Sequence, residues 1–218
     1  MTGLVEVTWF GHACFMLKSE KSVVFDPFKG IGLPEPKASA DIVLCSHSHS
    51  DHNNIGAVKH VKSIVLEGFT GRRQIDNVPV RGIATFHDDA QGGKRGKNSV
   101  YVVGLDDINF CHLGDLGQAL SASQVSEAGS VDVLFLPVGG IYTIGPDEAR
   151  RIMEAVGPKI AVPMHYRMAG MSATFDKLSI IDDFLRRDDN VRKLIGPSFT
   201  VTKADLLGKM QIVVPKLG

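Results

Sequence analysis

The sequence predicts an α/β protein in which two sheets pack face to face and helices lie on the outside. Short runs rich in Val, Phe and Trp dominate the first half, and apolar strands alternate with helical segments in the second. That order is typical of layered α/β architectures. The chain has no repeat of fixed period, no low-complexity tract and no long linker, so we expect residues 1–218 to form one domain.

The first half is expected to consist mainly of strands separated by turn residues. Apolar and aromatic enrichment predicts strands over 5–10, 14–18, 22–26, 63–67, 80–86, 99–104 and 108–112. The stretch 41–46 is continuously apolar after its first residue, as in a strand buried on both faces. Between it and the strand at 63–67, residues 54–61 are expected to form a helix.

Helix signals become frequent in the second half. Ser121 and Gln124 have the spacing of a capping box, and Pro146 begins a helix that Gly157 and Pro158 end. The apolar spacing of residues 175–187 suits an amphipathic helix. Strands are expected at 131–137, 159–164, 199–202 and 210–214.

The bulk composition narrows the partners that the chain can have. Lys plus Arg and Asp plus Glu each number 24, so no net charge favours nucleic acid or an anionic membrane. We see no signal peptide and no apolar run of the roughly 20 residues that span a bilayer. Three widely spaced cysteines, Cys14, Cys45 and Cys111, suggest reduced thiols in the cytoplasm. A small-molecule substrate is therefore expected, and a homo-oligomer stays open.

The strongest chemical signal is the run His47-Ser-His49-Ser-Asp51-His52, directly after the apolar stretch 41–46. Side chains two residues apart in an extended segment point to the same side, so His47 and His49 can bind one ion. Asp51 and His52 follow and can face a second ion. Imidazole and carboxylate groups are the ligands of catalytic zinc, and they also suit manganese, iron or nickel.

Three more candidate ligands stand at the ends of expected strands. His87 follows the strand at 80–86, Asp115 follows 108–112, and His165 follows 159–164. Active sites of α/β proteins collect at the carboxyl ends of strands, so these side chains can meet the histidine-rich run. His112 is expected to be a core residue or to orient a ligand, and His12 to border the site or to fill a hairpin turn.

The motifs His47-x-His49-x-Asp51-His52, His87, Gly114-Asp115 and His165 together resemble the metallo-β-lactamase fold superfamily. The segments around His12 and His165 further resemble its small hydrolases related to ascorbate-6-phosphate lactonase. The resemblance implies a four-layer αβ/βα sandwich with a metal site of two divalent ions, zinc first among them, at one sheet edge. It implies that His47, His49 and His87 hold one ion, that Asp51, His52 and His165 hold the other, and that Asp115 bridges them.

Departures from two branches of the superfamily narrow the chemistry that the resemblance implies. The best-known β-lactamases carry Cys at the position of Asp115, which argues against antibiotic hydrolysis. The diiron oxygen reductases carry Glu at the position of His49, which argues against a redox centre. The resemblance therefore implies a hydrolase in which Asp51 and Asp115 serve catalysis, and a metal-bridging hydroxide attacks an ester, lactone or phosphoester.

The segment 88–98 is the one hint about the substrate. It contains Lys94, Arg95 and Lys97 among glycines next to His87, which suggests a flap that holds an anionic group. A solvated turn explains the same residues equally well. Two further functions stay open: a phosphodiesterase or nuclease, because two-metal sites suit phosphoryl transfer, and a metal-bound binding module with little turnover.

Overall fold

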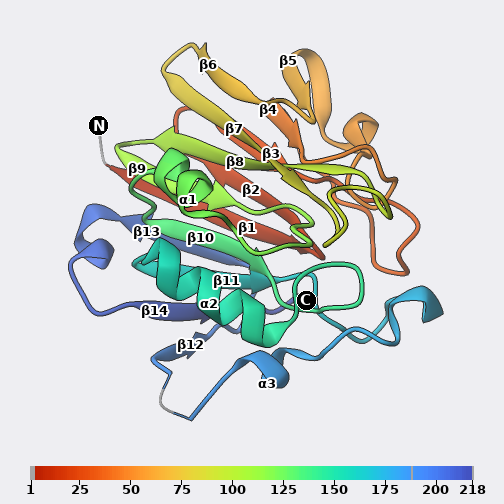
Figure 1. The fold of residues 1–218 in the computed structure, drawn as a ribbon. Coiled ribbons are helices and arrows are strands. Elements are labelled where there is room, and N and C mark those ends of the chain that lie inside the picture. Colours follow the sequence, from red (N-terminus) through yellow and green to blue (C-terminus); the bar gives the residue numbers. More distant parts are fainter. Residues whose placement is uncertain (1–2, 188, 218) are drawn as a thin grey trace.

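The computed structural model describes residues 3–187 and 189–217, and two mixed sheets packed face to face form its centre (Figure 1). One sheet has six strands in the order β13-β1-β2-β3-β4-β5. The other has eight strands in the order β12-β14-β11-β10-β9-β8-β7-β6. The prediction of two mixed sheets is therefore confirmed.

The six-stranded sheet comes from the beginning of the chain and one late strand. Its members are β1 (Leu4–Gly11), β2 (Cys14–Lys18), β3 (Ser22–Phe25), β4 (Ala40–Cys45), β5 (Lys59–Glu67) and β13 (Ser198–Thr202). The first three strands form an antiparallel meander, whereas β3, β4 and β5 run parallel. The carboxyl ends of β3 and β4 therefore lie at the same edge of the sheet.

The eight-stranded sheet is antiparallel on one side and parallel on the other. The antiparallel part comprises β6 (Gly71–Ile75), β7 (Val78–Phe86), β8 (Lys97–Leu105) and β9 (Ile108–His112). The parallel part comprises β10 (Val133–Pro137), β11 (Ile160–Met164), β12 (Val191–Lys193) and β14 (Gln211–Val214), and β9 also pairs in parallel with β10. The carboxyl ends of β9, β10 and β11 consequently meet.

Side chains alternate between the two faces of the six-stranded sheet. Ile42 and Leu44 face the eight-stranded sheet and join the main core, which also holds Trp9, Phe15 and Phe135. Val43 and Cys45, one residue further along β4, face outward into a second apolar cluster. This period of two is the geometry of a strand, and burial on both faces explains why the sequence of β4 is continuously apolar.

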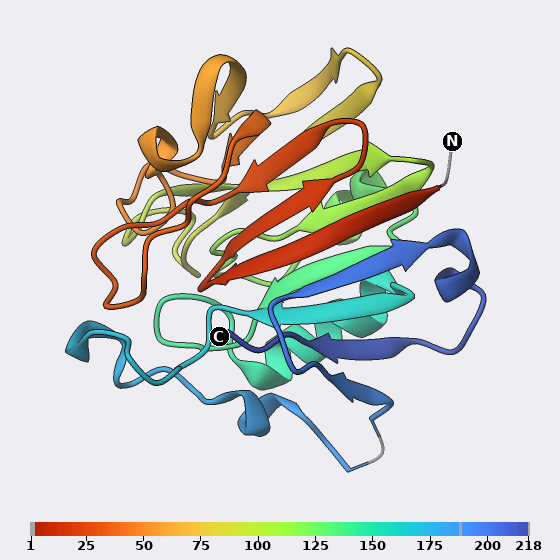
Figure 2. The same ribbon diagram turned by 180° about the vertical axis from the view of Figure 1, so that it is seen from behind.

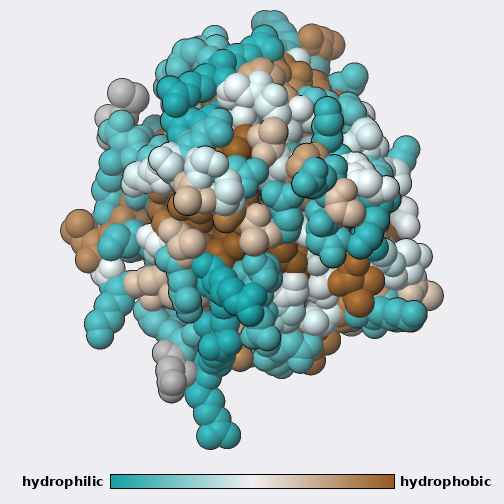
Figure 3. Space-filling view, in the orientation of Figure 1, coloured by the Kyte–Doolittle hydropathy of each residue, from teal (hydrophilic) through white to brown (hydrophobic). Residues whose placement is uncertain are grey.

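The two outer layers differ. Helices α1 (Ala122–Ala128) and α2 (Pro146–Val156) lie over the outer face of the eight-stranded sheet (Figure 1). The outer cluster on the six-stranded sheet instead includes Phe28, Ile31 and Phe175 from irregular segments. In the reverse view, loops of the first part of the chain lie beside the ends of the strands of this sheet (Figure 2). The face seen in Figure 3 is largely hydrophilic, with smaller apolar areas between polar side chains.

Two expected helices are wrong. In the region 54–61, only Ile55–Ala57 form a 3-10 turn, and β5 already begins at Lys59 because this segment pairs with β4. In the region 175–187, a 3-10 turn ends at Phe175 and α3 covers only Ile181–Phe184. The apolar residues of this second region serve two surfaces, since Phe175 packs in the outer cluster and Phe184 in the main core.

Strands β6 and β12 were not expected from the sequence. The capping box at Ser121 and the helix from Pro146 are confirmed. Within the described part of the chain, every helix is too short or too polar to cross a membrane.

Candidate metal centre

The candidate metal centre lies where the carboxyl ends of several strands meet between the two sheets. One contributing turn joins β1 to β2, and the other segments follow β4, β7, β9 and β11. They bring together all seven ligands expected from the sequence and one further histidine: His47, His49, Asp51, His52, His87, Asp115, His165 and His12.

Asp115 stands at the centre of these side chains. Its Oδ2 atom lies 3.2 Å from Nε2 of His52, 3.2 Å from Nε2 of His87 and 3.3 Å from Nε2 of His165. Nε2 of His47 is 4.0 Å from the same oxygen. One carboxylate oxygen therefore faces four histidines from three separate segments of the chain.

The ligand atoms divide into groups that could each hold an ion. His47, His49 and His87 form the first group. His12, Asp51, His52 and His165 form the second, and in each group the ligand atoms lie within 4.8 Å of one another. His47, His52 and Asp115 form a third group that joins the other two. We call the first two groups the first and the second metal position.

The state of the buried nitrogen atoms fits a metal site. Nε2 of His47, His52 and His165 is buried, and none of these atoms has a hydrogen-bond partner among the described residues. Their distances of 3.2–4.0 Å to Asp115 are long for hydrogen bonds. An ion with bonds of about 2.0–2.1 Å in tetrahedral geometry separates its ligands by about 3.4 Å. These residues therefore suit a shared ion better than direct contact.

Asp26 orients two of the histidines from behind. This fully buried carboxylate follows β3, and its Oδ2 lies 2.9 Å from Nδ1 of His52 and accepts a hydrogen bond of 2.7 Å from the Ser46 hydroxyl. Oδ1 accepts from the Ser46 backbone N–H at 2.7 Å, and Ser46 Oγ lies 2.9 Å from Nδ1 of His47. With the proton on Nδ1, the neutral rings of His47 and His52 present their Nε2 lone pairs to a metal.

Asp26 was not expected at the site, although its position in the sequence carries a signal. Asp26 is the last residue of the expected strand 22–26, and other candidate ligands also stand just after the ends of expected strands. Its backbone has a φ of 42°, in the left-handed region that Asp adopts more readily than most residues. A search for polar residues at all strand ends would have found it.

The turn that carries Asp115 is held by Asn98, which was also missed. The Asn98 side-chain oxygen accepts the Asp115 backbone N–H at 3.0 Å, and its amide donates to the Leu113 carbonyl at 2.9 Å. Gly114 between them has a φ of 57°, and a Cβ atom there would collide with Asn98 and Ser46. The sequence Gly114-Asp115 is thus explained by a close approach of three segments.

His112 lies behind the metal positions and is in none of the ligand groups. Its ring stacks on Phe25 at 4.8 Å, and its Nδ1 accepts the Gly114 N–H at 3.1 Å. Nε2, which therefore carries the proton, donates to the Ala13 carbonyl at 2.8 Å. His112 consequently ties the turn before Asp115 to the turn that contains His12.

Burial and neighbouring charges determine the protonation of the ligands. Burial, followed by the His52 charge, lowers the pKa of His47 to about 3. Burial opposes ionisation of Asp115, but His165 and His52 hold its pKa well below the ordinary carboxyl value. His52 is also buried, yet the carboxylates of Asp115 and Asp26 raise its pKa. A neutral His47 and an ionised Asp115 are the forms that bind metal.

A cavity of about 570 Å³ adjoins the first metal position. His47 and His49 line it together with Arg95 and Lys97, two of the three cations expected near a substrate. Lys94 does not line this wall, and its ammonium group pairs with Asp89 at 2.6 Å.

Hydrogen bonds to one carboxylate hold the loop that carries Lys94 and Arg95. The carboxylate of Asp88 accepts four backbone N–H groups at 2.6–3.0 Å, from Ala90, Gly92, Lys94 and Arg95. Although desolvation opposes it, these donors lower the pKa of Asp88 to about 2. A buried carboxylate therefore fixes the loop, and the glycines allow its backbone to turn around that group.

Known proteins are similar to this chain in sequence and in fold. Residues 6–165 match the sequence model of the beta-lactamase superfamily domain. A UPF0173 metal-dependent hydrolase from Thermococcus onnurineus is 30% identical over 191 residues, which cover 75% of this chain and 85% of the relative. A crystal structure of a candidate Zn-dependent hydrolase of the metallo-beta-lactamase superfamily from Thermotoga maritima has a TM-score of 0.80 and 36% identity, and covers 98% of this chain and 100% of that one.

A more distant structure shows the fold alone. The metallo hydrolase Igni18 from Ignicoccus hospitalis is 21% identical with a TM-score of 0.66, over 91% of this chain and 98% of that one. The family model covers most of the chain, and the nearer relatives align along three quarters of it or more. The chain therefore belongs to the metallo-β-lactamase superfamily, among its metal-dependent hydrolases.

Proposed function

We propose that this protein hydrolyses an ester, lactone or phosphoester bond of a small anionic substrate at a centre of two divalent ions. The observation that carries the proposal is the position of Asp115. Its Oδ2 atom lies within 3.3 Å of Nε2 of His87, from the first metal position, and of His52 and His165, from the second. A carboxylate between two groups of ligands is suited to bridge two ions.

When bound, two such ions supply a water of lowered pKa as nucleophile and polarise the bond that it attacks. The side chains of the protein fix where this happens. Asp115 is 2% exposed and held by Asn98, so its oxygen stays between the two positions. Asp51 is 26% exposed, which allows its carboxylate to pass a proton between a leaving group and solvent.

The cavity beside His47 and His49 supports an anionic substrate. The side chains of Arg95 and Lys97 contribute positive charge to its wall; Arg95 belongs to the loop fixed by Asp88, and Lys97 begins β8. Cations that face a substrate phosphate or carboxylate contribute binding energy without taking part in bond breaking. The proposed substrate therefore carries its charge on the side of the first metal position.

Zinc is our proposal for the metal, since imidazole and carboxylate ligands suit it and the Thermotoga maritima relative is described as Zn-dependent. Manganese, iron and nickel share this ligand set. We also propose the cytoplasm as the location, because Cys14, Cys45 and Cys111 are buried free thiols.

A substrate screen tests the proposal. Zinc-loaded protein and an Asp115→Asn control are assayed on generic lactones, carboxylic esters, thioesters, phosphomonoesters and phosphodiesters. Turnover of an anionic lactone, ester or phosphomonoester by the native protein, absent in the control, is expected. Turnover of phosphodiesters alone would instead assign a phosphodiesterase or nuclease. No turnover with metal bound would assign a binding module.

A further inference from the structure

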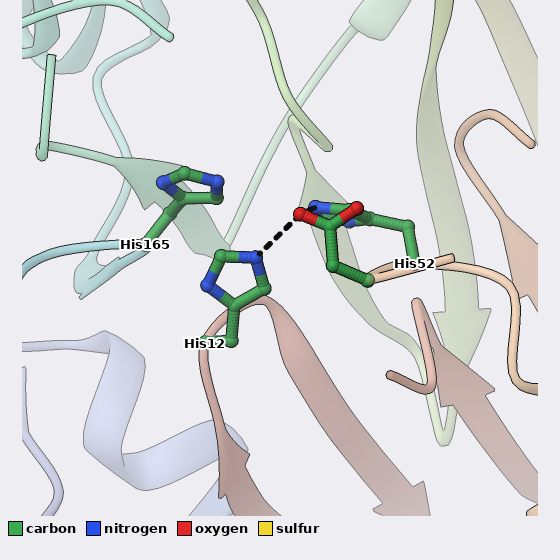
Figure 4. Close-up of side chains that lie close together, drawn as sticks. His12, His52 and His165 are labelled. Atoms are coloured by element: carbon green, nitrogen blue, oxygen red, sulfur yellow. Dashed lines mark ion pairs between the residues drawn. The ribbon is translucent and has the colours of Figure 1, made fainter. Parts of the chain in front are cut away.

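Of the eight side chains gathered at the metal centre, His12 is the one without an assigned role. It occupies the turn between β1 and β2, with a φ of 52°, and is fully buried. Its ring lies 4.1 Å from that of His165 and 4.9 Å from that of His52, and it faces the carboxylate of Asp51 (Figure 4). We infer that His12 is a direct ligand of the ion at the second metal position, an inference that rests on the proposed two-ion centre.

His12 has the same unsatisfied nitrogens as His165. In both residues Nδ1 and Nε2 are buried and have no hydrogen-bond partner among the described residues. A buried imidazole that is neither bonded nor hydrated is unfavourable, so such atoms need an explanation. An ion at the second position provides the same explanation for His12 as for His165.

The distance from His12 to Asp51 also suits a shared ion. Nε2 of His12 lies 3.5 Å from Oδ2 of Asp51, and Nε2 of His52 lies 3.8 Å from the same oxygen. These separations exceed an ordinary N–H···O hydrogen bond, but they are short enough for both atoms to bind one ion at the usual bond length of about 2.0–2.2 Å. The carboxylate of Asp51 therefore lies at a similar distance from Nε2 of His12 and from Nε2 of His52.

The backbone of the turn that contains His12 is held in place from several sides. The His12 carbonyl accepts hydrogen bonds from the indole N–H of Trp9 at 3.1 Å and from the His165 backbone N–H at 3.3 Å. His112 holds the next carbonyl, that of Ala13. Such contacts fix a ligand before metal arrives, and they attach His12 directly to the segment of His165.

The two metal positions then differ in function. The second position has four ligands of its own besides the shared Asp115, whereas the first has three, His47, His49 and His87. Fewer protein ligands leave room for water or substrate, and the first position is also the one beside the cavity. The second ion should consequently be retained more tightly, and substrate should exchange at the first.

The test compares His12→Gln with His60→Gln, which makes the same change at a half-buried histidine on β5 outside the ligand groups. Glutamine can still donate a hydrogen bond to Asp51, but its amide is a poor ligand. Each purified protein is loaded with zinc chloride and then titrated with a chelator, and retained zinc is measured by elemental analysis. The native protein and His60→Gln should show a tight and a weaker ion.

We expect His12→Gln to raise the Kd of the tight ion by about a hundredfold or more, since losing even an outer contact of a ligand costs about 10–100-fold. The weaker ion should be retained, which shows that the variant is folded. A tight ion of unchanged affinity in His12→Gln would overturn the inference. If the native protein binds no zinc at all, both the proposed two-ion centre and the role of His12 as a ligand are wrong.

A second measurement separates a ligand from a residue that only holds Asp51. In zinc-loaded protein with isotope-labelled histidine, NMR distinguishes a metal-bonded imidazole nitrogen from a protonated or a free one. The His12 signals, assigned by their loss in His12→Gln, should include a metal-bonded nitrogen. If both nitrogens are free of metal while His52 and His165 are bonded, His12 acts through Asp51 and the inference is wrong.

Discussion

Replacing Asp26 by asparagine should weaken metal binding although Asp26 is not a ligand. The carboxylate is buried, and its Oδ2 takes hydrogen bonds at His52 Nδ1 and from the Ser46 hydroxyl, while Oδ1 takes the Ser46 N–H. An asparagine amide accepts on one side only, so either His52 or the Ser46 N–H loses its acceptor. Asparagine tolerates the left-handed backbone at this position, which keeps the substitution a local one.

The size of the effect follows from the number of histidines that depend on this carboxylate. If His52 accepts from the new amide, its proton moves to Nε2, the atom that faces Asp115. His47 loses support too, because Ser46 links its Nδ1 to Asp26. Loss of an outer carboxylate typically costs about 10–100-fold in metal affinity, or about 1.4–2.7 kcal/mol. With two ligands affected, we expect the upper part of this range.

The assay is chelator competition for zinc, with Asp41→Asn as the matched control. Asp41 holds Ser22 in the same sheet much as Asp26 holds Ser46, through the Ser22 N–H at 2.9 Å and the Ser22 hydroxyl at 2.8 Å, but it belongs to none of the ligand groups. Asp41→Asn should leave zinc affinity unchanged. Equal affinities in Asp26→Asn and the native protein would refute the role assigned to Asp26.

Three further variants test other parts of the site. Asp115→Asn should lower zinc retention at both positions, because the shared carboxylate is lost, and elemental analysis that still finds both ions would contradict this. Neutralising Arg95 and Lys97 should raise KM for an anionic substrate about two- to thirtyfold at low salt, with little change in kcat. This range follows from about 0.2–1 kcal/mol for each of the two contacts. The control Lys94→Ala should change neither KM nor kcat, because the charge of Lys94 pairs with Asp89. Asp88→Asn should destabilise the metal-free protein in urea. Because the pKa of Asp88 falls from the ordinary value to about 2 on folding, the difference in unfolding free energy between the native protein and the variant should be full above about pH 5 and shrink as the pH falls toward 2. A difference that grows on acidification would be inconsistent with an ionised Asp88.

Local sequence patterns predicted most strands and two helices. Strands such as Cys14–Lys18 and Ile108–His112 have the expected bounds, as has the helix Pro146–Val156. These elements carry their own signals, namely apolar runs between turn residues, or a proline at the start and a glycine at the end. The region 54–61 has no such local signal, because the pairing of Lys59–Glu67 with β4 determines its conformation.

The amphipathic pattern at 175–187 failed for a different reason. Its apolar residues match a helical period, but Phe175 and Phe184 pack in different clusters. A helical period of apolar residues indicates a helix only if a single surface of the protein covers all of these residues. That condition depends on how distant segments pack. The two missed strands, Gly71–Ile75 and Val191–Lys193, are mostly exposed and have little apolar signal of their own.

For the metal centre, the sequence by itself determined which side chains can act as ligands. His47, His49, Asp51 and His52 lie in one short segment, and His87, Asp115 and His165 end recognisable strands, so residue type and strand position sufficed. Only the tertiary structure decided what stands behind and beside them. Asp26 and His12 come from other segments, and Lys94 pairs with Asp89 outside the wall of the cavity. Hydrogen bonds and ion contacts act over a few ångströms, and only packing of the two sheets determines which distant residues come that close.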